Sequence, residues 1–457
     1  MVLSSNARDA SGAHVAPGSE TQDGWGAPVS PTGAATLEAW ERTVLSLAGH
    51  RADTGAGLAE VLAADPDFVP GLCLRGFASL FKGRNDLRTE AREAHARAAH
   101  LVATRGATTR ESTLVAALSD WIDDAIERAS TRLEGLSRET PTDLFVVKLE
   151  HGCLFMQGRP AALRRSVERV LPAWSPAMPG YGYVLGCHAF ALEETYAFDE
   201  AEAAGRRAVA HQPDDAWGIH AVSHVMEMQD RAQEGVDWLS SHAAGYAGCN
   251  NFRAHVYWHQ ALFHCELDQH DAALALYDAE VHNAWTGDYR DMSNRASLLW
   301  RLEVDGVNVG DRWDDLAARA RERARDHGSA FADAHYVLAL GRTGGCAELL
   351  ASLEAFTATE RGGDQARVSR EVARPLCEAM SLALRGRPEE GVEALAGLQR
   401  KVLRLGGSHA QRDLFEQFFI DAALRAHRHD LARVALARRL HQRPNNRWAR
   451  TRMARLT

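Results

Sequence analysis

Apolar residues recur every three or four positions along most of the chain, starting near residue 37. Leu37, Trp40, Val44 and Leu47 form the first such stripe, and Ala- and Leu-rich segments of the same period follow, each ended by a short polar breaker. Apolar residues at this spacing lie on one face of an α-helix. Alternating runs of β-branched residues, which are typical of strands, are absent from the sequence. The chain is therefore predicted to be all-α.

Turn residues and small residues repeat along this pattern. Proline precedes a helix at Pro66, Pro213 and Pro444, where it ends one helix and fits the first turn of the next. Small residues recur where helices must touch, at Ala201, Gly235, Ala273 and Gly391. The first three lie 34 and 38 residues apart (235 − 201 and 273 − 235), close to the 34-residue period of a tetratricopeptide helix pair. We predict a tetratricopeptide-like α-solenoid of helical hairpins, curled into a compact superhelix of about 16 to 20 helices.

The two ends of this pattern define the expected domains. Residues 1–34 are rich in Gly, Ser, Ala, Pro and Asp without periodic apolar positions, so they are predicted to form a disordered leader. Residues 35–457 are predicted to form one continuous helical-repeat domain, because each repeat buries its apolar face against its neighbours.

Composition narrows the expected partners and compartment. The net charge of −9, from 52 basic and 61 acidic residues, argues against a nucleic-acid partner. No run of 18 apolar residues occurs, and the N-terminus lacks the basic and apolar regions of a secretion signal, so no membrane association is expected. The seven cysteines are widely spaced without a CxxC pair and indicate reduced thiols in a cytoplasmic protein.

Four histidines stand in two identical steps within the helical pattern. His220 and His224 lie four residues apart, as do His255 and His259, so each pair shares one face of a helix. Both pairs are offset by 35 residues (255 − 220 and 259 − 224), three fewer than the 38-residue offset of the small residues. That difference is about one helical turn, which keeps the second pair near the same face. All four imidazoles are therefore predicted to point at one inner surface.

Further polar and aromatic residues accompany these histidines. Candidate ligand-binding residues are Trp217, Asn251, Tyr257, Trp258, Asp291, Asn294 and Arg301, with His409 and Arg412 further along the chain. Ser408 and Gln411 have the spacing of a capping box. His409 and Arg412 would then lie in the first turn of a helix, where free backbone N–H groups attract an anion.

Four segments, residues 216–239, 250–278, 297–313 and 406–417, resemble the tetratricopeptide-repeat protein 38 family. The resemblance extends from about Tyr181 to the C-terminus and implies an α-solenoid, but no reaction, because the family has no general assigned activity. Where family members usually have glycine in the hairpin turns, this chain has Asp230 and Asp268, which tolerate a left-handed backbone.

Three interpretations of the four histidines remain open. They are structural side chains between helices, the lining of a small-molecule pocket with acid or base catalysis, or ligands of a metal ion. Metal binding is not favoured, because HAVSH lacks the glutamate of the HExxH signature and the surroundings are rich in arginine. The metal set would be His220, His224, His255 and His259.

The favoured function is binding of a small, anionic ligand in a His/Trp/Arg-lined inner pocket. The four histidines are the candidate catalytic residues, and whether the chain is an enzyme stays open. The alternative is an interaction scaffold that holds a partner peptide in its concave groove. A scaffold is expected to disperse the four histidines, whereas a pocket is expected to gather them beneath the chain's own C-terminal segment.

Overall fold

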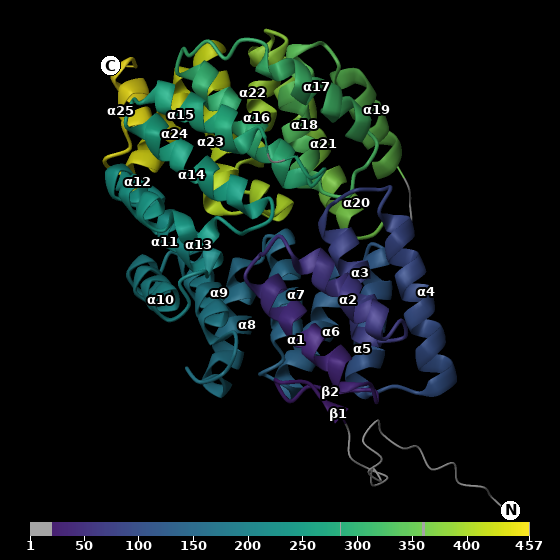
Figure 1. Ribbon diagram of the computed structural model, residues 1–457. Coiled ribbons are helices and arrows are strands. Elements are labelled where there is room, and N and C mark those ends of the chain that lie inside the picture. Colours follow the sequence, from purple (N-terminus) through teal and green to yellow (C-terminus); the bar gives the residue numbers. More distant parts are fainter. Residues whose placement is uncertain (1–20, 284, 359–361, 457) are drawn as a thin grey trace, which may run out of the picture.

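The computed structural model describes residues 21–283, 285–358 and 362–456. Within these ranges it contains 25 α-helices and one short β-hairpin, arranged as a superhelix of stacked helical pairs (Figure 1). The prediction of an all-α helical-repeat superhelix is confirmed. The helices outnumber the expected count of about 16 to 20. Short helices such as α13 (Ala243–Tyr246) and α20 (Asp364–Val368) are the reason, since they show no periodic pattern of their own.

The remaining elements follow one another without long connections. The first half comprises β1 (Thr21–Gln22), β2 (Pro28–Val29), α1 (Ala34–Ala48), α2 (Thr54–Ala64), α3 (Val69–Phe81), α4 (Arg88–Arg105), α5 (Thr109–Ile122), α6 (Ile126–Glu139), α7 (Leu144–Met156), α8 (Pro160–Val170), α9 (Tyr181–Glu193), α10 (Phe198–His211), α11 (Ala216–Met228) and α12 (Ala232–Ser241). The second half comprises α14 (Phe252–Glu266), α15 (His270–Leu276), α16 (Tyr289–Val304), α17 (Arg312–Arg323), α18 (Ala330–Arg342), α19 (Cys346–Thr357), α21 (Arg374–Leu384), α22 (Pro388–Leu398), α23 (His409–Arg425), α24 (His429–Gln442) and α25 (Arg447–Ala454). Short 3₁₀ segments (Leu171–Ala173, Val402–Leu405) and π segments (Tyr277–Val281, Ser369–Ala373) adjoin them.

Hairpins repeat at a nearly constant interval in the middle of the chain. The inner helices α9, α11, α14 and α16 begin at residues 181, 216, 252 and 289, which are 35, 36 and 37 residues apart. A residue with positive φ ends the first helix of each of these hairpins, including Asp230 (57°) and Asp268 (63°). These two aspartates therefore occupy the left-handed turn positions that the sequence indicated.

The ordered chain begins earlier than residue 35. Residues 1–20 of the predicted leader lie outside the described residues, but residues 21–33 form a β-hairpin that packs on the first helices. Trp25 and Val29 are buried, and Trp25 Nε1 donates to the Pro179 carbonyl at 2.9 Å. Ser30 Oγ donates to Glu111 at 2.6 Å. The leader boundary at residue 34 was wrong, because these contacts join segments about 80 to 150 residues apart, which local composition does not reveal.

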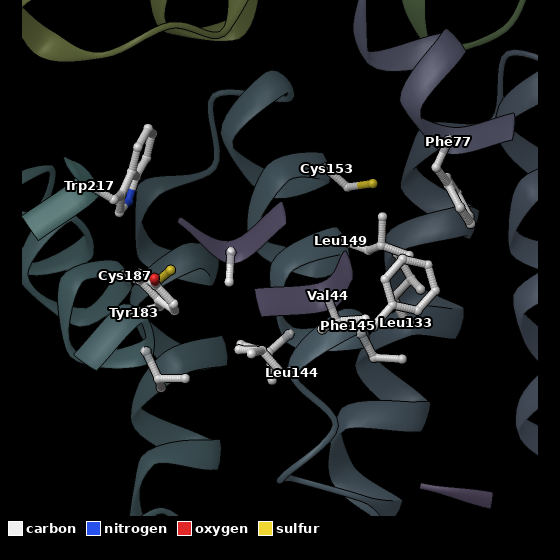
Figure 2. Close-up of a cluster of buried hydrophobic side chains, with 14 of the residues drawn as sticks. Val44, Phe77, Leu133, Leu144, Phe145, Leu149, Cys153, Tyr183, Cys187 and Trp217 are labelled. Carbon is white, nitrogen blue, oxygen red and sulfur yellow. The ribbon is translucent and has the colours of Figure 1, made fainter. Parts of the chain in front are cut away.

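Buried apolar side chains form two adjoining clusters, one over residues 25–263 and one over residues 258–449. Tyr257 packs against both, so the core passes through α14 without a break. Figure 2 shows part of the first cluster, with side chains from successive inner helices. Its labelled members include Val44, Phe77, Leu133, Phe145, Leu149, Tyr183, Cys187 and Trp217.

The superhelix closes on itself at two places. The C-terminal helices α24 and α25 lie beside α14 and α15 (Figure 1), and Arg447 Nε donates to the Glu266 carbonyl at 2.9 Å. Near the other end, α20 meets the turn between α5 and α6, where the Asp364 N–H donates to the Asp124 carbonyl at 2.7 Å. Among the described residues, no helix is both long and apolar enough to cross a membrane.

Candidate metal centre

Two neighbouring helices turn the four predicted histidines towards each other. His220 and His224 lie on α11, His255 and His259 lie on α14, and none is more than 5% exposed. Because each pair spans four residues, its two rings follow one another along the helix, and the two ridges meet. The structure thus gathers the four imidazoles in one place.

The Nε2 atoms of these rings face one another. His220 Nε2 lies 3.1 Å from His255 Nε2, and His224 Nε2 lies 3.1 Å from His259 Nε2. A third distance of 3.3 Å joins the Nε2 atoms of His255 and His259. One ring nitrogen from each histidine lies within 4.8 Å of those of the other three. These distances leave no room for an organic ligand between the rings.

Three of the rings are held from behind through Nδ1. The pairs are His224 with Glu193 Oε2 at 3.2 Å, His259 with Glu227 Oε2 at 3.1 Å, and His255 with Asn294 Oδ1 at 2.9 Å. Such partners orient the ring and fix its tautomer in metal-bound histidines. His220 differs, because its Nδ1 has no hydrogen-bond partner among the described residues.

The two glutamates decide where the protons of His224 and His259 lie. When each Nδ1 donates to an ionised carboxylate, each Nε2 keeps a lone pair, and the two lone pairs face each other across 3.1 Å. Two facing acceptors in a dry interior repel each other, so a cation or a shared proton must lie between them.

Burial governs the charge of this cluster. It lowers the pKa of His220 and His259 well below the ordinary value and lowers that of His255 to about 3. Burial likewise raises the pKa of Glu227 to about 7. For Glu193, burial alone would raise the pKa, but His409 and His224 outweigh it and lower this pKa to about 2. The histidines are therefore neutral ligands at pH 7.

Three of the other predicted residues support the cluster from α14 and α16. Trp258 stacks on His255 with ring centroids 5.2 Å apart, and its Nε1 donates to Ser297 Oγ at 3.0 Å. Asn294 accepts from His255, and the Arg301 guanidinium lies 5.8 Å from the Trp258 ring centre. These residues contact the cluster as packing and hydrogen-bonding partners.

Trp217 occupies the opposite side, where several buried polar atoms lack partners. Its ring lies 5.1 Å from that of His220, 5.1 Å from that of His50 and 5.8 Å from that of His151. Trp217 Nε1, His220 Nδ1, His50 Nε2 and both ring nitrogens of His151 have no hydrogen-bond partner among the described residues. Lys148 Nζ lies 5.6 Å from the Trp217 ring centre.

Three predicted residues are not brought to the imidazoles. Asn251 Nδ2 donates to Asp291 Oδ1 at 2.8 Å, and Asp291 also accepts from Thr286. Tyr257 lies two positions after His255 on α14, so it points away and packs against Tyr246 with a centroid distance of 5.4 Å. The pairing of Asn251 with Asp291 closes the start of α14 on α16.

The predicted anion site at the start of α23 is filled by the protein's own carboxylates. The capping box of Ser408 and Gln411 is present as expected. The His409 N–H donates to Glu194 Oε1 at 2.6 Å, and Arg412 Nη2 donates to Glu194 Oε2 at 2.8 Å. His409 Nδ1 lies 3.2 Å from Glu193 Oε1.

Sequence reasoning missed Glu193 and Glu194 and could not place Glu227. Glu193 and Glu227 lie 34 residues apart (227 − 193), at the ends of the inner helices α9 and α11. Each accepts from a histidine of the next inner helix, 31 and 32 residues further along the chain. A buried acid repeated at the helix-pair period was the available signal.

The larger pockets lie elsewhere. A pocket of about 480 Å³ lies where α20 meets the N-terminal half, and its lining includes Arg88, Trp121, Arg159 and Gln365 but none of the four histidines. A smaller cavity of about 30 Å³ adjoins the centre at Glu227 and Arg301, on the side of α23 and α24. The histidines themselves are packed without a pocket wide enough for an organic ligand.

No family model matches the chain. Among solved structures, the chain is similar to a monomeric IFIT1 mutant with Gppp-AAAA, at 14% identity over 92% of this chain and 95% of that chain, with a TM-score of 0.37. Yeast Tom70 matches at 12% identity over 92% and 88%, with a TM-score of 0.33. The TPR domain of P58(IPK) matches at 11% over 76% and 96%, with a TM-score of 0.22. Similarities this low concern only the helical-repeat fold.

Proposed function

We propose that this helical-repeat protein binds one divalent transition-metal ion, zinc in the first instance, through the Nε2 atoms of His220, His224, His255 and His259. The observation that carries the proposal is the convergence of four neutral Nε2 atoms, three of them on rings fixed through Nδ1. A metal ion at their centre removes the repulsion between facing lone pairs. Its tight, buried environment is typical of a structural centre.

The spacing supports a tetrahedral ion. With metal–nitrogen bonds of about 2.0–2.1 Å, the edges of a tetrahedron of nitrogens are about 3.3–3.4 Å long. The three shortest Nε2 separations are 3.1, 3.1 and 3.3 Å, so small outward shifts of the rings suffice. Neutral imidazoles suit zinc, copper, nickel or iron, whereas calcium and magnesium require oxygen ligands.

Metal analysis tests this proposal. We expect the purified full-length protein, loaded with zinc and dialysed, to retain about one zinc ion per chain by elemental mass spectrometry. His224→Ala and His259→Ala should each retain less than about a tenth of that, because the lost ligand also leaves a buried carboxylate unpaired. The exposed His100 on α4 provides the matched control, and His100→Ala should bind zinc normally.

Thermal denaturation supplies an independent measurement. Free zinc at about a thousand times its Kd should stabilise the protein by about 4 kcal/mol, and neither ligand variant should show this gain. Circular dichroism verifies that the variants remain helical. Zinc, copper, nickel and iron all absent after loading, or a ligand variant that binds as wild type does, would refute the metal centre.

A small anion bound beside the centre is a second candidate, favoured by the unpartnered polar atoms around Trp217. Trp217 Nε1–H can only donate, and Lys148 forms no ion pair with a described carboxylate. Buried polar atoms without partners indicate water or a ligand that completes them. A surplus of donors and one cation suits a carboxylate or phosphate group. This keeps the predicted anionic ligand but places it next to the imidazoles.

Calorimetric titration of the zinc-loaded protein with sodium acetate and with inorganic phosphate tests this second candidate. Saturable binding of one probe should be lost in Lys148→Met and kept in Lys401→Met, since Lys401 is exposed. Equal binding by both variants, or no binding of either probe to wild type, would remove the candidate.

Some expectations remain part of the proposal. The seven cysteines are buried free thiols, which supports a reducing, cytoplasmic location. The resemblance to the tetratricopeptide-repeat protein 38 family carries no reaction with it. The scaffold alternative predicted dispersed histidines, so their convergence supports the metal centre over a peptide-binding groove as the role of these side chains.

A further inference from the structure

One carboxylate connects the histidine cluster to the C-terminal part of the chain. Glu193, at the end of α9, is fully buried. Its Oε2 accepts from His224 Nδ1 at 3.2 Å, and its Oε1 accepts from His409 Nδ1 at 3.2 Å. The residue that orients one ring of the centre is therefore itself held by the first residue of α23, 216 positions away.

Glu194 fixes the same helix end to α23. It accepts from the His409 backbone N–H at 2.6 Å and from Arg412 Nη2 at 2.8 Å. The capping box of Ser408 and Gln411 holds the backbone of this first turn in place. The docking of α23 on α9 is thus rigid, and it ends on the carboxylate behind His224.

A second connection runs through α16. Asn294 holds His255, and Arg301 on the same helix donates to the Ala410 carbonyl of α23 at 3.3 Å. Both connections meet the first two residues of α23. Rotation or withdrawal of this turn would release partners of two different imidazoles.

We propose that His409 is a positioning residue for the metal centre, acting through Glu193, and that metal binding and the docking of α23 on α9 stabilise each other. The inference rests on the metal centre proposed above. His409 holds Glu193 in the orientation that keeps the His224 proton on Nδ1 and its Nε2 lone pair on the metal. Because the coupling between two binding events is reciprocal, a bound metal favours docking of α23 to the same extent.

Competition with a chromophoric zinc chelator measures the first half of this proposal. Loss of a partner of this kind usually lowers metal affinity about 10–100-fold, and we expect a fall of that size for His409→Ala with about one zinc still bound at saturation. His409→Gln keeps a side-chain N–H donor and should recover part of the affinity. Arg367→Ala is the matched control, because Arg367 bridges to Glu127 at the other closure, away from the histidines.

Hydrogen exchange of the full-length protein measures the second half. Zinc should slow exchange at residues 409–416 in wild type and have a smaller effect there in His409→Ala, while residues 364–368 change little in either protein. An affinity for His409→Ala within twofold of wild type, or exchange in α23 that is insensitive to zinc, would overturn the inference while leaving the metal centre standing. A wild-type protein that binds no metal would overturn both.

Discussion

At the scale of single residues, buried carboxylates in this helical interior fall into two electrostatic situations. Asp413 lies beside Arg439, with Oδ2 3.0 Å from Nη2, and this cation outweighs burial and holds the pKa of Asp413 well below its ordinary value. Asp215 precedes α11, and neither of its oxygens has a hydrogen-bond partner among the described residues. Burial raises the pKa of Asp215 to about 7, against the opposing charge of Lys148. Ionised Asp215 therefore destabilises the folded protein.

This gives a pH-dependent prediction for Asp215→Asn. A pKa raised from 3.8 to about 7 contributes stability that is fully present below pH 3.8 and is lost as the pH rises through 7. Asparagine has no such loss and still offers an oxygen at the helix start. We expect the variant to be more stable than wild type by about 1–3 kcal/mol at pH 8, with a smaller difference at pH 5. Urea denaturation at both pH values measures this, and a larger gain at pH 5 would contradict it.

The histidine cluster shows which parts of a site local spacing can predict. A step of four residues and a common offset of 35 sufficed to predict that four imidazoles meet, because both depend only on helix geometry and repeat length. Asn294 was found in the same way, from its helical stripe. Glu193 was not, because its contact with His224 depends on how successive hairpins are inclined. The metal interpretation was underrated for the same reason: the acids behind the rings, not the rings themselves, distinguish it.

At the scale of helices, the small residues of the repeat lie where helices touch. Ala201 and Ala273 are fully buried, and a Cβ on Gly235 would lie 2.3 Å from the Phe263 ring. On α22, a Cβ on Gly391 would lie 2.7 Å from the Ala379 carbonyl oxygen. These positions were predicted from sequence, because close helix approach needs a small side chain at a fixed place in each repeat.

Helix α22 offers two glycines with opposite expected responses. Gly391→Ala should destabilise the protein by about 1–3 kcal/mol, since the backbone of α21 must move away. Gly397→Ala on the same helix meets nothing within 4 Å, so the better helix propensity of alanine should stabilise by about 0.5–1 kcal/mol. Thermal denaturation of both variants tests the pair. Effects of the same sign would show that α22 does not pack on α21 as described.

The β-hairpin at residues 21–33 shows where element prediction fails. Its strands are two residues long, which is too short for an alternating pattern. Trp25 is its only large aromatic side chain, and its partner Pro179 lies 154 residues away. Composition therefore resembled that of a linker, although the segment is part of the folded protein.

At the scale of the whole molecule, closure joins parts of the chain that are more than 200 residues apart. The contacts of Asp364 with Asp124, of His409 with Glu193 and of Arg443 with Asp230 all depend on the accumulated curvature of the superhelix. Small angles between successive hairpins add up over the molecule, and no local pattern encodes their sum. The repeat architecture could therefore be predicted, whereas the closure and the second-shell acids at the centre could not.

Two aspartates in equivalent turns separate closure from local backbone effects. Asp230 and Asp268 both have positive φ, so replacement by glycine relieves a similar strain at each position. The Asp230 side chain is only 5% exposed and accepts from Arg443 Nε at 3.0 Å and from the Asn445 N–H at 3.2 Å. The Asp268 side chain is 65% exposed, and its ion pair with Arg447 lies at the surface.

Asp230→Gly should therefore loosen the C-terminal closure, and Asp268→Gly should not. Breaking a buried pair leaves the Arg443 guanidinium without its carboxylate, which costs about 3–5 kcal/mol, whereas an exposed pair contributes less than about 1 kcal/mol. We expect Asp230→Gly to speed hydrogen exchange in α24 and α25 and to lower the denaturation midpoint, while Asp268→Gly stays close to wild type. Because both variants gain the same backbone freedom, the difference between them measures the side-chain contact alone. Equal exchange in the two variants would show that the C-terminal helices stay in place without the buried pair.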